Sequence, residues 1–356
     1  MIVTDAWALF WTRGKDALCA EIGLRYGRPG CNGRPEAQKM LVNAAVDAFR
    51  TRAGRGLHGH AEVSQLPNPG EGAAPLTGEL NPDAALRRII TTCRTDLHRY
   101  RAVVLASSQP EGIHQTRVAL RRLRAAIGLF RDVVANPELR GIAAEARWLA
   151  GECAPARDLH VFLAEVVPDA PDQISRVGAR LADKRQSRAR SALGGPRFAR
   201  FDRDLERFIV APPSAAGETL KDFASRALDA HHAKVRRRGR NLSELKAADL
   251  HRLRIAVKKL RYAAAFLLPV FEPTPATAYV DAVESLQNAL GIMNDRTVGA
   301  KVLADISGAA RPSDKARRSC KRLGKHLKDR GRHDRRNLRQ AWRAFKKAVP
   351  FWRESP

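Results

Sequence analysis

Two short segments of the sequence carry the same arrangement of basic side chains around a histidine. In both, basic residues follow the histidine at positions +3, +7, +8 and +10. The first segment supplies His114, Arg117, Arg121, Arg122 and Arg124. The second supplies His251, Arg254, Lys258, Lys259 and Arg261. Because guanidinium and ammonium groups donate charge-assisted hydrogen bonds to phosphate and carboxylate oxygens, the pattern predicts an anion-binding site.

Helical spacing places most of these cations on one stripe. At about 100° per residue, His114, Arg117, Arg121 and Arg124 share one face, whereas Arg122 lies on the other flank. A separate apolar face consists of Leu120, Leu123, Ile127 and Phe130. Like charges one turn apart destabilise an isolated helix by a few tenths of a kcal/mol per pair. We therefore expect an anionic ligand along about three turns, roughly 15 Å, which suits a linear polyanion.

Each histidine is expected near the start of its helix. Pro110 and Gly112 precede His114, and Asp249 is a candidate N-cap before His251. A helix N-terminus offers free N–H groups to a phosphate. The two histidines are accordingly expected to contact phosphate, or else to be hydrogen-bonded residues of the core.

A second pair of matching segments lies at the same separation in the sequence. Arg157 and Asp158 align with Asn294 and Asp295, and the offset of 137 residues also relates His114 to His251. Two matches at one offset predict a tandem duplication over residues 83–352. The two aspartates are expected to cap a helix or to orient a motif arginine, rather than to bind a metal.

The periodicity predicts an all-α fold. From residue 83 onward, Ala/Leu/Arg-rich segments with helical spacing alternate with Pro/Gly-rich breaks, which indicates about eight helices in two four-helix bundles, 83–211 and 212–352. Residues 1–66 have no clear periodicity, and residues 67–82 are rich in Pro and Gly. We therefore leave 1–82 as an unassigned segment and linker.

The overall composition restricts the partners and the compartment. The net charge is +27 and 44% of residues are hydrophobic, which indicates a folded protein with an anionic partner such as nucleic acid, a membrane surface or another polyanion. Five separated cysteines without a C-x-x-C pair favour a reducing compartment and argue against a zinc site. The longest apolar run is too short to span a membrane. We expect a cytoplasmic protein without a membrane partner.

Further basic residues on other predicted helices are candidates for a secondary basic surface. They are Lys184, Arg185, Arg188, Lys328, Arg332, Arg335 and Arg339. A solvated face without a ligand explains them equally well.

The two motif helices, the Arg157-Asp158 and Asn294-Asp295 segments and the closing Pro350-Phe351-Trp352 resemble the CHAD domain family, the conserved histidine α-helical domain. The resemblance covers about residues 83–352. It implies tandem four-helix bundles related by a pseudo-two-fold axis around a basic groove or pore. It also implies binding of inorganic polyphosphate by the ten motif residues, localisation to polyphosphate granules, and neither a metal nor a cofactor.

Two other functions remain open. A helical nucleic-acid-binding protein would need the same phosphate contacts, although the stripes carry no aromatic residue for base stacking. The second open function is that of an accessory module in a system that hydrolyses polyphosphate or triphosphate. Relatives often carry an N-terminal CYTH domain, but residues 1–82 lack its E-x-E-x-K strand. The expected function is therefore non-catalytic binding.

Overall fold

The computed structural model describes residues 76–166, 172–213, 217–271, 276–310, 315–329 and 331–353. All of them belong to one compact unit. The described residues are helices, turns and connecting segments without a strand, which confirms the predicted all-α fold. Most of the unassigned N-terminal segment, residues 1–75, lies outside this description.

The first half of the duplicated region contributes five α-helices. They are α5 (Pro82–Ala106), α6 (Pro110–Phe130), α7 (Glu138–Val161), α8 (Asp172–Gly194) and α9 (Pro196–Val210), with a π-helical turn, η2 (Phe162–Val166), continuing α7. Proline stands in the first turn of α5, α6 and α9, where its missing N–H costs no hydrogen bond. Asn81 caps α5, because its side chain accepts a bond of 2.7 Å from the N–H of Asp83.

The second half also contributes five α-helices. They are α10 (Leu220–Arg238), α11 (Ala247–Leu267), α12 (Ala276–Ala309), α13 (Lys315–Asp329) and α14 (Gly331–Lys347), with a 3-10 turn, η3 (Leu268–Val270), after α11. Adding 137 to the bounds of α6 gives the bounds of α11, and adding it to the last residue of α9 gives that of α14. These helix boundaries therefore repeat at the predicted offset, with five helices in each half of the described chain where the sequence predicted four.

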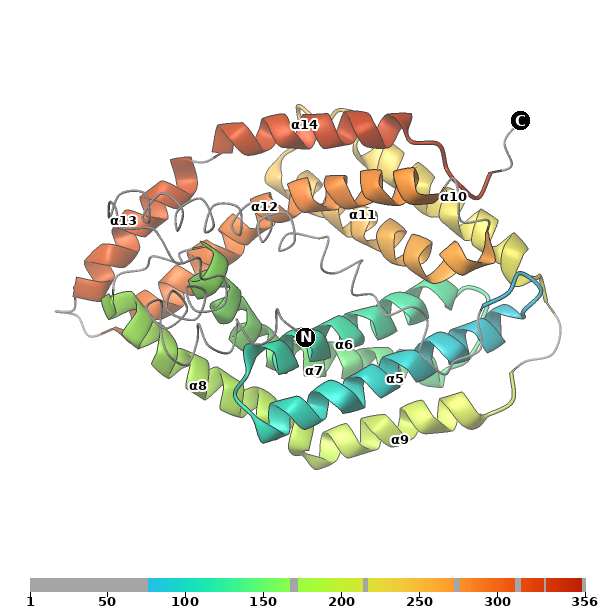
Figure 1. Ribbon diagram of the computed structural model, residues 1–356, viewed down its shortest axis with the longest axis horizontal. Coiled ribbons are helices and arrows are strands. Elements are labelled where there is room, and N and C mark those ends of the chain that lie inside the picture. Colours follow the sequence, from blue (N-terminus) through green and yellow to red (C-terminus); the bar gives the residue numbers. More distant parts are fainter. Residues whose placement is uncertain are drawn as a thin grey trace, which may run out of the picture. The chain divides into compact units, whose positions relative to one another are not determined.

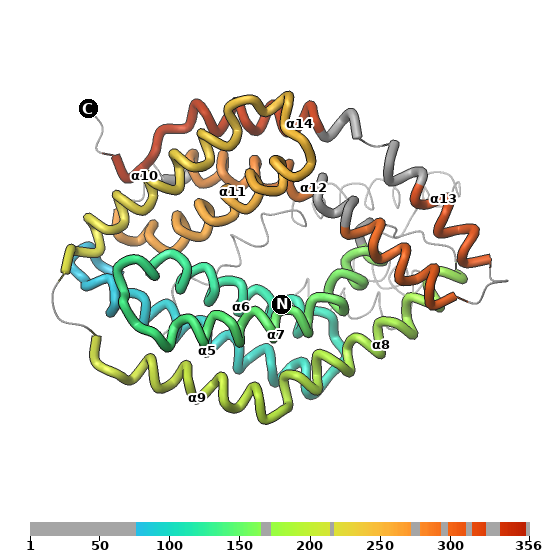
Figure 2. Tube along the Cα trace, turned by 180° about the vertical axis from the view of Figure 1, so that it is seen from behind, coloured from blue at the N-terminus to red at the C-terminus, as the bar shows by residue number. Residues whose placement is uncertain are grey.

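Corresponding helices of the two halves pack on one another. Contacts join α5 to α10, α6 to α11, α7 to α12 and α8 to α13. Figure 1 and Figure 2 show α6 beside α11 from both sides. Buried apolar residues from α5 through α12 and from α14 form one continuous core, so the halves share their interior. A smaller cluster joins the end of α7, α8, the end of α12, and α13.

Two connecting segments are attached to the helices by specific contacts. Residues 76–81 fall in the Pro/Gly-rich stretch, yet Leu76 is buried, and the carbonyls of Leu80 and Gly78 accept bonds of 2.7 and 3.0 Å from the N–H groups of Leu220 and Lys221. These bonds satisfy two of the free N–H groups at the start of α10. At the other end of the second half, Phe351 and Trp352 are buried in the shared core.

Candidate anion-binding site

The two motif helices meet at a tyrosine that the motif does not include. Arg121 of α6 donates its Nε–H to the hydroxyl of Tyr262 in α11. The guanidinium carbons of Arg121 and Arg261 each lie 6.0 Å from the centroid of the Tyr262 ring. One arginine from each motif copy therefore reaches the same aromatic ring, and the packing of α6 on α11 brings the two stripes together.

The side chain of Arg117 extends from α6 to α7. Its Nη1 donates a hydrogen bond of 2.8 Å to the carbonyl of Ala150 in α7. Burial lowers the pKa of the Arg117 guanidinium; the carboxylate of Asp158 opposes this shift, while Arg157 and Arg121 add to it. Asp158 lies in the last turn of α7 and pairs with Arg157 at 3.4 Å, so it is not a helix N-cap. The expectation that it acts on a motif arginine agrees with this attraction.

The motif position at +8 differs between the two halves. Arg122 is only 6% exposed, and its Nη1 lies 3.8 Å from Oδ2 of Asp96 in α5. Burial raises the pKa of Asp96, and the charges of Arg122 and Arg99 oppose that shift. The equivalent Lys259 is exposed, and Ala233 stands where Asp96 stands in the first half. α5 therefore covers this flank and supplies a counter-ion for Arg122, while the contact of Arg122 with a ligand stays a prediction.

The position at +10 shows the opposite arrangement. Arg124 is exposed, and its pKa is lowered by partial desolvation and by the charge of Arg147 in α7. The equivalent Arg261 is only 3% exposed and lies against Tyr262. Arg261 thus lies in the interior, and its contact with a ligand stays a prediction. Of the last two motif cations, the first half therefore has Arg124 at the surface and Arg122 buried. The second half has Lys259 at the surface and Arg261 buried.

The two histidines and the remaining cations of the second motif are at least partly exposed to solvent. His114 is half-buried and His251 is exposed, while Arg254 and Lys258 are half-buried. α6 begins at Pro110 and α11 at Ala247, so each histidine stands one turn inside its helix. Lys246 occupies the N-cap position of α11, and Asp249 instead pairs with Arg252 within the first turn. The predicted helix-end site at the histidines is therefore wrong, because both helices start earlier than expected.

Comparison with known proteins agrees with this geometry. A family model described as "CHAD domain" matches residues 88–304. The chain belongs to the CHAD domain family. The resemblance seen in the motif helices is thereby confirmed, and the matched residues include both copies of the motif.

Solved structures share the CHAD fold. The crystal structure of the CHAD domain from the plant Ricinus communis is 25% identical, with a TM-score of 0.66, and the match covers 78% of this chain and 96% of that one. The structure of PptA from Streptomyces chartreusis is 18% identical, with a TM-score of 0.52, and the match covers 77% of this chain and 99% of that one, which shows the fold alone. Comparison with curated proteins found no significant match.

The first group of secondary cations in this CHAD domain is partly paired with the protein's own carboxylates. Arg188 forms a two-bond pair with Glu152, with Nη2 at 2.9 Å from Oε1. Arg185 pairs with Asp305 of α12 at 2.5 Å, and Lys184 is exposed. These pairs join α8 to neighbouring helices, so a structural role explains Arg185 and Arg188 without a ligand.

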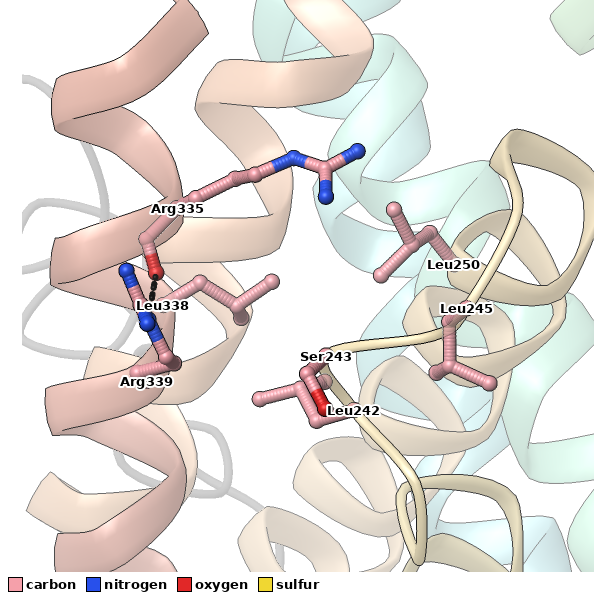
Figure 3. A pocket seen from close by; sticks show the side chains of 7 residues that line it. All are labelled: Leu242, Ser243, Leu245, Leu250, Arg335, Leu338 and Arg339. Atoms are coloured by element: carbon pink, nitrogen blue, oxygen red, sulfur yellow. Dashed lines mark hydrogen bonds between the residues drawn. The ribbon is translucent and has the colours of Figure 1, made fainter.

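The second group of secondary cations lies on α13 and α14. Arg335 and Arg339 line a small pocket between α14 and the loop before α11, together with four leucines and Ser243 (Figure 3). Nε of Arg339 donates to the carbonyl of Arg335 at 3.3 Å, so this side chain folds back along its own helix. The side chains of Lys328 and Arg332 lie outside the described residues, as do those of Asn294 and Asp295.

Sequence reasoning missed several residues that surround the motif helices. Tyr262 directly follows the last motif cation, and Arg147 lies on α7, the helix to which Arg117 bonds. Lys234 and Arg238 of α10 and Arg131 at the end of α6 all act on Lys259. The spacing of Lys234 and Arg238, one helical turn apart, was the available signal. Among the described residues, no group of three His, Cys, Asp or Glu side chains is arranged to hold a metal, and no helix has the length and apolar character of a membrane span.

Proposed function

We propose that this CHAD domain binds inorganic polyphosphate without catalysing its breakdown. The observation that carries the proposal is the packing of α6 on α11, where Arg121 of the first motif copy reaches Tyr262 beside Arg261 of the second. The pKa values of Arg117, Arg124 and Lys259 are all lowered, first by desolvation, and in each case neighbouring cations contribute. An array of partly desolvated cations is stabilised by an anion that binds several of them at once.

The ligand-contacting residues in this proposal are the motif cations that stay at or near the surface. They are His114, Arg117, Arg121, Arg124, His251, Arg254, Lys258 and Lys259. Arg122 and Arg261 are omitted because their side chains are buried. The contacts between corresponding helices support a pseudo-two-fold arrangement of two repeats, 83–211 and 212–352, with the stripes bordering a shared basic groove.

The chemistry of these side chains favours binding over catalysis. Four of the eight are arginines, whose guanidinium stays protonated and therefore cannot serve as a general base. They are suited to holding the non-bridging oxygens of a phosphate chain by paired hydrogen bonds. As the family resemblance implies, we assign the protein to the cytoplasm, at polyphosphate granules.

Calorimetric titration with long-chain polyphosphate tests the proposal. The double variant Arg124→Glu/Lys258→Glu changes one accessible cation in each motif helix. Two lost charge-assisted bonds of about 1.5 kcal/mol each correspond to an increase in Kd of roughly a hundredfold. The matched control Arg203→Glu/Lys221→Glu makes the same change in net charge at exposed positions on α9 and α10. It should alter Kd far less, because only the long-range field is changed.

Three outcomes would overturn the proposal. Equal weakening by the two double variants would mean that net charge, rather than the motif helices, attracts the polymer. Comparable affinity for duplex DNA at matched salt would favour the nucleic-acid alternative, since phosphate contacts alone give sequence-independent, salt-dependent binding. Release of orthophosphate from the polymer by the purified chain would establish the hydrolytic alternative instead.

A further inference from the structure

Basic side chains of α10, together with Arg131 at the end of α6, lie near Lys259 on the flank of α11 that borders the stripe. His231, Lys234 and Arg238 are spaced three and four residues apart in α10, so they share one face of that helix. α10 packs on α11, and Nη1 of Arg238 donates a bond of 2.7 Å to the carbonyl of Arg252. Arg131 stands directly after α6, which also packs on α11.

The charges in this cluster act on one another. Desolvation lowers the pKa of Lys259, and the charges of Lys234, Arg131 and Arg238 lower it further. Burial together with the charges of Lys259 and Lys234 lowers the pKa of His231 to about 4. Two carboxylates lie near the ends of the cluster: Asp132 pairs with the exposed Arg131 at 3.1 Å, and Asp249 pairs with Arg252, whose carbonyl Arg238 binds. Cations held this close in partly desolvated positions favour an anion among them.

The cluster has no equivalent in the first half of the chain. The residue equivalent to Lys259 is Arg122, which is buried beside Asp96. The residue equivalent to Lys234 is the buried Leu97, and the one equivalent to Arg131 is Leu268. Arg101, equivalent to Arg238, donates to the carbonyl of Leu193 and lies over the ring of Phe198. The arrangement around Lys259 is therefore not repeated around Arg122 and does not follow from the repeated motif.

We propose that Lys259, Lys234, Arg131 and Arg238 form a second phosphate-binding patch, which holds phosphate groups of polyphosphate separately from those on the stripes. The inference rests on the proposed function. In helical projection Lys259 lies about 80° round α11 from His251 and about 100° from Lys258, so it borders the stripe without belonging to it. A phosphate group held between Lys259 and α10 is therefore displaced from those that the stripe binds.

Amine labelling of the full chain separates the patch from the stripe. Mass spectrometry follows the reaction of each lysine with an amine-reactive reagent, alone and with orthophosphate, tripolyphosphate or long-chain polyphosphate. Lys258 reports on the stripe, Lys234 and Lys259 report on the patch, and Lys221 in the first turn of α10 serves as the control. We expect long-chain polyphosphate to slow labelling of Lys258, Lys234 and Lys259 several-fold and to leave Lys221 nearly unchanged. Protection of Lys234 and Lys259 by orthophosphate or tripolyphosphate would show that the patch binds a free phosphate anion. Protection by long-chain polyphosphate alone would show that the patch needs the polymer.

Each outcome bears on a different claim. Protection of Lys258 and Lys259 without protection of Lys234 overturns the patch and leaves the proposed function standing. Protection of Lys234 and Lys259 by tripolyphosphate, in a chain that binds no long-chain polymer, supports the patch and overturns the proposed function. Absence of protection at all three lysines overturns both.

A pair of single variants provides a second measurement. In calorimetry with long-chain polyphosphate, Lys234→Glu should raise Kd several-fold and reduce the slope of log K against log salt by about one. Lys221→Glu carries the same charge change about 20 Å away along α10, by the helical rise of 13 residues. Equal effects of the two variants would contradict a local patch.

Discussion

Arg121 in α6 donates its Nε–H to the hydroxyl of Tyr262 in α11, so a cation of one motif copy is held by the helix that carries the other. The residue equivalent to Tyr262 in the first half is Ala125, so the first half offers no such acceptor. Tyr262 also stacks on Phe266, with ring centroids 6.1 Å apart. The bond therefore fixes Arg121 against a ring that is itself held by packing.

Replacing Tyr262 by Phe should destabilise the fold by about 1–2 kcal/mol, because a partly buried charged donor loses its acceptor while the ring contacts remain. Urea unfolding measures the change. Tyr100→Phe in α5 is the matched control, since the Tyr100 hydroxyl has no hydrogen-bond partner among the described residues. Equal stability of the two variants would show that the bond between α6 and α11 contributes nothing.

Loss of Asp96 should be more costly. Asp96→Asn removes the carboxylate beside the buried guanidinium of Arg122, and breaking a buried ion pair typically costs about 3 kcal/mol or more. Adding Arg122→Met should restore much of the stability, because no unpaired charge then remains in the interior. Denaturant midpoints of the single and double variants measure both effects, and a double variant less stable than Asp96→Asn would contradict this account.

Stability should fall as the pH is lowered from 6.5 to about 4. Burial lowers the pKa of both His231 and His232 to about 4, and burial also lowers that of His160. The unfolded chain therefore takes up protons in this range that the folded chain does not, so the stability present above pH 6.5 is progressively lost. The carboxylates of Asp202 and Asp229, whose pKa values lie below their usual range, reduce stability only at still lower pH.

The double variant His231→Gln/His232→Gln should show a flatter dependence between pH 6.5 and 4. Urea unfolding at a series of pH values provides the comparison. His232 is neutral in the folded state, with Nδ1 at 2.8 Å from the Tyr279 hydroxyl, and glutamine retains a polar group at that place. The same pH profile in wild type and variant would assign the effect to other groups.

Trp352→Ala should destabilise the fold by about 3–5 kcal/mol. The Trp352 side chain is 5% exposed, lies edge-on to the Tyr279 ring at 4.9 Å, and donates its Nε1–H to Asp229 at 2.9 Å. Val349→Ala, three residues earlier at a position 73% exposed, should change stability by no more than about 0.5 kcal/mol. Thermal unfolding of the two variants tests whether the segment after α14 belongs to the core.

The spacing of residues predicted the parts of the fold that depend on local sequence. The helical character of residues 83–352 and the 137-residue offset follow from periodicity within single segments, and the bounds of α6 and α11 obey that offset. The boundaries themselves were harder to predict, since Asp249 has the residue type of an N-cap but lies inside the first turn of α11. A separation as short as that between α13 and α14 leaves no clear break in the sequence, and the prediction of four helices in each half fell short of the five that the described residues form.

The parts of the site that depend on neighbouring helices could not be read from the motif. Arg122 and Lys259 occupy the same motif position, and the presence of Asp96 opposite one and Ala233 opposite the other accompanies their different burial. The motif position at +10 differs in the same way. Arg124 is exposed near Arg147, but in the second half their equivalents are Arg261 and Glu284, and both of these are buried. Spacing along one helix fixes which residues share a face, but the opposing helix decides whether that face is covered.

Contacts between corresponding helices are those that two identical subunits make across a two-fold axis, where each residue meets the same surroundings in both copies. In such a homodimer a single substitution appears twice, so a buried arginine on one side could not coexist with an exposed lysine on the other. Covalent fusion removes that constraint. The two halves use this freedom, since Arg122 has the carboxylate of Asp96 beside it, whereas the position equivalent to Asp96 in the second half is Ala233 and Lys259 is exposed.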